Sequence, residues 1–134
     1  MGKDSELIKK YGTKRVLFEC AQRGLEVFAP SIDTKGVDII IQTNSSDTKE
    51  IQVITRVPKE GKNFDIPLSY LSDKDNSYIA CYFFKSDDVW IIPSNEFVKL
   101  NELDPKDNPS ARVTIDKKNI KEFKGYFNNY DQLQ

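Results

Sequence analysis

The amino-acid sequence predicts an α/β fold with a central mixed β-sheet flanked by helices. Helical and strand-like patterns follow one another in the order α, β, β, β, β, β, α, β, α, which is typical of a mixed sheet with helices packed on it. Ile39, Ile40 and Ile41 are consecutive within one strand pattern, so both faces of that strand are expected to be buried. We expect the 134 residues, 1–134, to form a single domain.

Two helical segments are predicted near the N-terminus, the first running from about Ser5 to Gly12 and Thr13. The second covers residues 14–23, with Thr13 as its cap and Gly24 as its C-terminal stop. Residues 25–28 then alternate in polarity like a short strand. Apolar residues recur at helical spacing in the second segment, namely Val16, Leu17, Cys20 and Ala21.

A β-hairpin is predicted next. Residues 36–43 form its first strand, residues 44–47 have strong turn chemistry, and residues 49–57 form the returning strand, which Pro58 ends. Because apolar residues point to both faces of the first strand, the pattern favours a central strand rather than a surface hairpin.

The second half of the chain is predicted to complete the sheet. Residues 58–77 are rich in loop formers, and strands at 78–84 and 89–92 follow, joined by a turn. A short helix at 95–100 with Ser94 as its cap comes next, then a polar loop at 101–110 and a strand at 113–115. A last helix is expected from Asp116 or Lys117, with an apolar stripe made of Ile120, Phe123 and Phe127.

The composition limits the chemistry that the chain can perform. Histidine is absent, which excludes Ser-His-Asp and Cys-His triads and histidine metal ligands. The two cysteines, Cys20 and Cys81, are too few for a disulfide framework or a four-thiolate zinc site, and we expect both to be reduced and buried. Lys and Arg total 20 against 21 Asp and Glu, so any DNA binding requires a local patch.

The sequence gives no indication of membrane insertion. Its start has no apolar core, and the longest uncharged apolar run is only a few residues long, too short to span a bilayer. We therefore expect a cytoplasmic protein that does not contact a membrane.

Four polar residues form the candidate site. The hairpin turn folds residues 49–57 back beside 36–43, which brings Asp38 to the level of Gln52 and Ile54. Glu50 and Gln52 are two residues apart and leave the same face of their strand. Glu19 lies on the preceding helix. An acid on one strand and an acid-x-lysine on its neighbour can hold Mg²⁺ through oxygen ligands and activate a water molecule.

At these motifs the sequence resembles the PD-(D/E)XK nuclease superfamily, whose fold is restriction endonuclease-like. It is most similar to the small Holliday-resolvase-like and intron-endonuclease-like branch. The matching stretches are Gly12-Thr13, Glu19, Arg23-Gly24-Leu25-Glu26-Val27, Gly36-Val37-Asp38-Ile39-Ile40-Ile41 and Ile51-Gln52-Val53-Ile54-Thr55-Arg56.

The resemblance implies that Asp38 and Gln52 are the ligands of a Mg²⁺ ion and that Glu19 is the helical acid of the site. The lysine position is Ile54, which carries neither a charge nor a proton. In an alternative register the pair is Glu50-x-Gln52, which also lacks the lysine. The catalytic candidates are therefore Glu19, Asp38, Glu50 and Gln52. A homodimer is a further expectation from the resemblance.

Basic residues near the expected site are candidates for contacts with DNA phosphates, and we select Lys14, Arg15 and Arg56. Together with Lys49, they are also candidates to supply the positive charge of the lysine that is missing at position 54.

Three functions remain open. One is a Mg²⁺-dependent DNA endonuclease, and another is a catalytically inactive relative that binds DNA or another protein. The third, less favoured, is an interaction or regulatory domain with no nuclease ancestry. Simpler structural roles also remain for three of the residues. These alternatives are a local bond for Asp38, a solvated position at the strand edge for Glu50, and a place on the polar face of its helix for Glu19.

Overall fold

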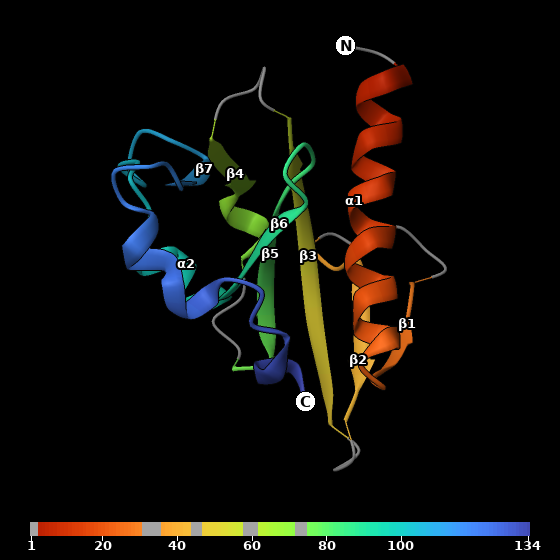
Figure 1. The fold of residues 1–134 in the computed structure, drawn as a ribbon. Coiled ribbons are helices and arrows are strands. Elements are labelled where there is room, and N and C mark those ends of the chain that lie inside the picture. The colour runs from red at the N-terminus through yellow and green to blue at the C-terminus, as the bar shows by residue number, and fades with distance from the viewer. Residues whose placement is uncertain (1–2, 31–35, 44–46, 58–61, 72–74) are drawn as a thin grey trace.

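The computed structural model describes residues 3–30, 36–43, 47–57, 62–71 and 75–134. It confirms the predicted fold class: a five-stranded mixed sheet carries the long helix α1 (Lys3–Gln22) along one face. Figure 1 shows α1 running beside β3, with the small β4–β7 sheet and the short helix α2 on the other side of the molecule. The predicted turn at 44–47 lies largely outside the described residues.

The strand order of the large sheet is β1-β2-β3-β5-β6. Its strands are β1 (Glu26–Phe28), β2 (Ile39–Gln42), β3 (Thr48–Arg56), β5 (Ser77–Phe83) and β6 (Asp88–Pro93). The predicted hairpins are present as the antiparallel pairs β2–β3 and β5–β6, and β3 and β5 pair in parallel at the centre.

The N-terminal helix is continuous, so the predicted break at Gly12 and Thr13 is wrong. Gly12 serves close packing instead: a Cβ atom at this position would overlap Oγ1 of Thr55 on β3. The predicted stop is confirmed, because Gly24 follows the helix with φ of +86° and Leu25 donates back to the carbonyl of Cys20.

A strand occurs where the sequence predicts a loop-rich segment. β4 (Asn63–Pro67) pairs antiparallel with β7 (Ser110–Thr114) in a second, two-stranded sheet. In β4, Phe64 and Ile66 are buried and alternate with Asp65. The strand is short and borders Pro67, which explains why the sequence pattern did not distinguish it from a loop.

The C-terminal region also departs from the prediction. Instead of one helix, the structure has the 3₁₀ helices η3 (Ile120–Tyr126) and η4 (Tyr130–Leu133). Of the expected stripe, Phe123 is buried, whereas Ile120 and Phe127 are exposed. The predicted cap of α2 (Ser94–Leu100) is wrong as well, because the Ser94 hydroxyl is buried and shares a 2.8 Å hydrogen bond with Ser77.

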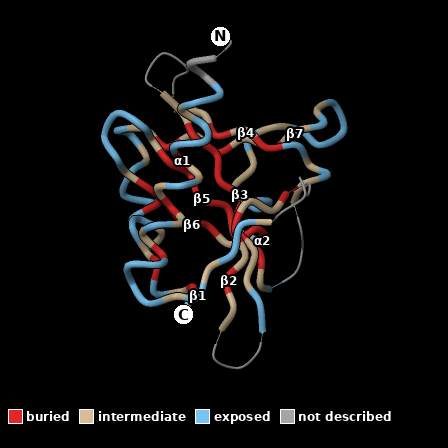
Figure 2. Tube along the Cα trace, turned by 90° about the vertical axis from the view of Figure 1, so that its right-hand side faces the viewer, coloured by how far each residue is buried: buried red, intermediate tan, exposed pale blue. Residues whose placement is uncertain are grey.

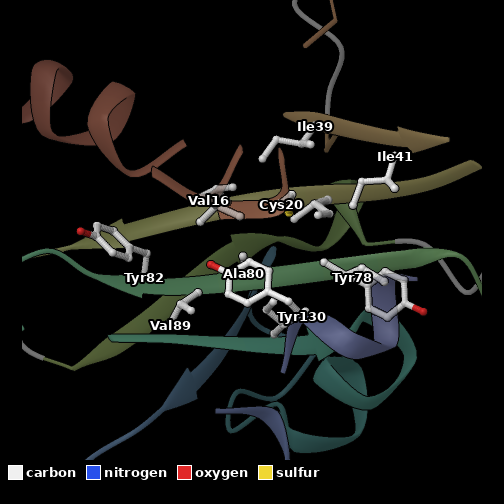
Figure 3. Packing of buried hydrophobic residues seen from close by; sticks show 13 residues of the cluster. Val16, Cys20, Ile39, Ile41, Tyr78, Ala80, Tyr82, Val89 and Tyr130 are labelled. Atoms are coloured by element: carbon white, nitrogen blue, oxygen red, sulfur yellow. The ribbon is translucent and has the colours of Figure 1, made fainter. Parts of the chain in front are cut away.

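Two buried clusters lie on the two faces of the sheet, and Figure 2 shows buried residues concentrated along its central strands. Beneath α1, Val16 and Cys20 pack against strand residues such as Ile39 and Ala80 (Figure 3). The other face packs against β4, β7 and α2. β2 is fully covered only on the α1 side, since Ile40 is half-buried.

The two cysteines are free thiols, as predicted, and both are buried. Burial raises the pKa of the Cys20 thiol to about 12 and also raises that of Cys81. In the part of the chain that the structure describes, no helix is long and apolar enough to cross a bilayer.

Candidate nucleic-acid interface

An open cavity of about 500 Å³ lies between α1, β3 and β4. Its lining comes from separate regions of the chain that the fold brings together. These are residues of α1 (Lys9, Lys10, Thr13, Lys14, Leu17), of β3 (Gln52, Val53, Ile54, Thr55, Arg56), of β4 and the turn after it (Asp65, Ile66, Pro67, Tyr70), and the two residues Ala29 and Asp38.

Asp38 is fixed at the point where the β2–β3 ladder ends. Its backbone N–H donates to the carbonyl of Ile51 at 2.8 Å, and its carboxylate Oδ2 accepts the N–H of Val53 at 2.8 Å. Gln52 lies between these two partners on β3, and its side chain lines the same cavity as Asp38. The hairpin therefore places Asp38 beside Gln52 and Val53 of β3, as the sequence predicted.

Ile54 follows Gln52 on the same face of β3 and forms part of the cavity wall. Its side chain is 7% exposed and packs into the cluster formed with Phe64 and Ile66 of β4. The position that the nuclease resemblance assigns to lysine is thus occupied by a nearly buried apolar side chain.

Three lysines of α1 line one side of the cavity, namely Lys9, Lys10 and Lys14, and all three are exposed. Arg56 lies on β3 and donates to the backbone carbonyls of Asn63 at 2.9 Å and Thr55 at 3.1 Å. With Asp38 and Asp65 as its acidic residues, the lining contains four basic and two acidic side chains.

Arg15 and Glu19 belong to a different network and do not line this cavity. Arg15 donates to both carboxylate oxygens of Asp87 and, at 2.9 Å, to Glu19, which also accepts from Arg23 at 3.0 Å. The hydrogen bond from Arg15 holds the pKa of Glu19 below its ordinary value. This network ties α1 to the β5–β6 turn, which accounts for both residues structurally.

Glu50 is also separate from the cavity. It is half-buried on β3, opposite Ile40 on one side and Ser77 on the other, and its backbone N–H donates to Asn76. The remaining cation candidate, Lys49, donates from Nζ to the carbonyls of Gln132 and Gln134. Of the four catalytic candidates, the fold brings together Asp38 and Gln52.

Thr13 and Asp65 are among the cavity residues that were not selected from the sequence. Thr13 lies on α1 between Lys9 and Leu17, which also line the cavity, and this spacing of four residues was a signal available in the sequence. Asp65 was hidden because its segment was interpreted as a loop. Its carboxylate binds Arg112 of β7 through contacts of 2.7 and 3.3 Å.

Asp38 and Gln52 are the residues of the cavity that could hold a Mg²⁺ ion, and they would form a sparse set of ligands. Gln52 is neutral, Asp65 is already paired with Arg112, and four basic side chains line the same space. Among the described residues, no three Asp, Glu or Cys side chains form a group that could hold a metal. A cavity with an excess of positive charge favours an anionic group such as a phosphate.

Neither the models of known protein families nor the sequences of curated proteins match this chain. Its structure, however, is similar to that of I-Ssp6803I, a bacterial homing endonuclease, with a TM-score of 0.66 and 16% identity over 98% of this chain and 91% of that one. It is also similar to Hjc, a Holliday junction resolvase from the archaeal hyperthermophile Archaeoglobus fulgidus.

The Hjc match has a TM-score of 0.58 and 11% identity, and it covers 79% of this chain and 83% of that one. The chain therefore has a restriction endonuclease-like fold, as its sequence resemblance implied. At these identities the likeness concerns the fold.

Proposed function

We propose that this chain is a nuclease-like domain that binds DNA through the cavity between α1 and β3 and does not hydrolyse it. The observation that carries this proposal is the charge of the cavity: Lys9, Lys10, Lys14 and Arg56 surround two carboxylates, and one of those is neutralised by Arg112. Lysine and arginine side chains bind the phosphates of the DNA backbone, and this attraction dominates non-specific affinity.

Local charge is what matters for this chain, because its formal net charge is −1. Four cations gathered in a concave surface raise the local positive potential even when the whole molecule is nearly neutral. The structural neighbours are a homing endonuclease and a Holliday junction resolvase, which supports DNA as the ligand.

The absence of hydrolysis in this proposal rests on two observations at the cavity. The resemblance places a lysine at the position of Ile54, which is buried and apolar here. Glu19 is not among the α1 residues that line the cavity, and its carboxylate is engaged by Arg15 and Arg23. Loss of one positioned acid or base typically lowers a reaction rate by about 10²–10⁴-fold.

The test is to measure the retention of a short DNA duplex at low salt, with and without Mg²⁺, and to examine the recovered DNA for cuts. We expect salt-dependent binding of intact DNA, weakened in the double variant Lys10→Gln/Lys14→Gln. Lys121→Gln is the matched control, because Lys121 is exposed on η3 and lines a different groove. Failure to bind at low salt would overturn the proposal.

The competing function is Mg²⁺-dependent hydrolysis at Asp38 and Gln52, which the adjacency of these two side chains favours. It predicts cutting of plasmid or branched DNA in the presence of Mg²⁺ or Mn²⁺, and loss of cutting in Asp38→Ala. That pair of results would replace the binding function with the catalytic one.

A further inference from the structure

The cavity has two chemically different sides. The α1 side carries the exposed ammonium groups of Lys9, Lys10 and Lys14. The side formed by β3, β4 and the residues after β4 includes the apolar residues Ile54, Ile66 and Pro67 and the half-buried Tyr70, together with the polar residues Gln52, Arg56 and Asp65. A surface that contacts only the phosphates of a duplex does not need these apolar and aromatic residues, here called the apolar wall, because the paired bases are stacked away from it.

We propose that the cavity accepts one unpaired nucleotide, with its phosphate against the α1 lysines and its sugar and base against the apolar wall. This inference rests on the proposed DNA binding and specifies the form of DNA that is bound. The volume of about 500 Å³ is within the range of about 300–1,000 Å³ that is typical of small-molecule sites. An unpaired base exposes both its ring faces and its hydrogen-bonding edges.

The apolar wall supplies the contacts that a base requires. Tyr70 is a half-buried aromatic residue of the cavity lining, and stacking of a base on an aromatic side chain is largely independent of its sequence. Ile54 extends this wall at the point where a lysine would introduce a charge. The exchange of lysine for isoleucine therefore converts this part of the cavity from a polar site into a surface for a base or a sugar.

Gln52 supplies a polar contact beside this wall. Its amide carries both donors and an acceptor, so it can pair with the edge of any base. Beside it, the Asp38 carboxylate is positioned by the N–H of Val53 and can accept the ring N–H of a thymine or the exocyclic amino group of another base. Asp38 and Gln52 thus act as binding residues in this proposal.

The experiment compares four ligands by titration calorimetry at one salt concentration. These are a 5′-phosphorylated oligothymidylate, thymidine 5′-monophosphate, thymidine, and inorganic phosphate. We expect the oligothymidylate to bind most tightly and the monophosphate to bind more tightly than either thymidine or phosphate alone. A preference for the oligothymidylate identifies a strand as the ligand; equal affinity for the monophosphate identifies a free nucleotide and overturns the strand assignment.

Variants of the apolar wall give the decisive contrast. Tyr70→Ala should weaken oligothymidylate binding by about tenfold and duplex retention by less. Ile54→Lys should also weaken it, whereas Ile54→Val, the matched control, should not. If inorganic phosphate binds as tightly as the monophosphate, or if Tyr70→Ala has no effect in a folded variant, the nucleotide site is refuted.

The two proposals fail in different ways. Loss of the nucleotide preference with duplex retention intact refutes the nucleotide site alone. Loss of all DNA binding at low salt refutes the proposed function together with it. Circular dichroism of each variant establishes that it is folded, and Tyr70→Ala retains a readout if the buried Ile54→Lys variant does not fold.

Discussion

The contact between α1 and β3 at Gly12 determines where the cavity lysines lie, and Gly12→Ala tests it. A Cβ atom at residue 12 would overlap Oγ1 of Thr55 and would lie 3.0 Å from its Cβ and 3.1 Å from its Cγ2. Rotating the Thr55 side chain exchanges the γ-atoms but does not move its Cβ, so the helix itself must shift away from the strand.

The magnitude follows from two opposing effects. Alanine is favoured over glycine within a helix by about 1 kcal/mol. Overpacking of a tight contact costs about 1–3 kcal/mol, and occasionally more. Because the overlap is severe, we take the upper end of that range, which leaves a net destabilisation of about 2 kcal/mol. For a domain of this size, that lowers the Tm by about 6 °C.

Thermal and urea unfolding, followed by circular dichroism, provide the assay. Gly125→Ala is the matched control, because a Cβ atom there would have no neighbour within 4 Å, and its stability should be unchanged or slightly higher. Adding Thr55→Ala to Gly12→Ala removes both γ-atoms and should recover about 1 kcal/mol or more. A Gly12→Ala variant as stable as the wild type would refute the packing argument.

Three further outcomes are expected. Asp38→Ala should lower the free energy of unfolding by about 1–3 kcal/mol, because the N–H of Val53 loses its acceptor. Asp38→Asn should lower it by less, because an amide oxygen can still accept this hydrogen bond. Equal losses for the two variants in urea titrations would contradict this. Asp87 has a lowered pKa because it accepts from Tyr82 and Arg15, so its stabilisation is present above its ordinary value of 3.8 and lost as the pH falls below it. Asp87→Asn should therefore reduce stability at pH 7 by no more than about 1 kcal/mol, because half of the side chain is exposed. The difference from the wild type should shrink as the pH falls below 3.8, and a constant difference would refute this prediction. Both buried thiols should resist a disulfide reagent at pH 8 until the protein unfolds, and rapid labelling of the native protein would contradict their burial.

Much of the sheet could be predicted from the sequence because its strands carry local signals. The run of three isoleucines and the turn residues after it predicted the β2–β3 hairpin, and the register of that hairpin brought Asp38 beside Gln52. Gly24 likewise ended α1 through a positive φ that glycine adopts without strain.

The remaining features depend on contacts between distant residues. Glycine at position 12 is typical of a helix break. Its actual role is close packing against Thr55, which is far away in the sequence. β4 was missed because its partner β7 lies more than forty residues further along the chain, and Asp65 was missed with it. Glu19 is an acidic residue, as a catalytic acid must be. Its carboxylate, however, forms ion pairs with Arg15 and Arg23, which lie four residues before and after it.

The central claim is that the lysines of α1 bind DNA phosphates at this cavity, and its most direct test is the salt dependence of duplex binding. A lysine that contacts a phosphate contributes about 1 to the slope of log K against log salt concentration. We predict that Lys10→Gln/Lys14→Gln lowers this slope by about 2, while Lys121→Gln leaves it unchanged. Equal slopes for the wild type and the double variant would contradict the claim.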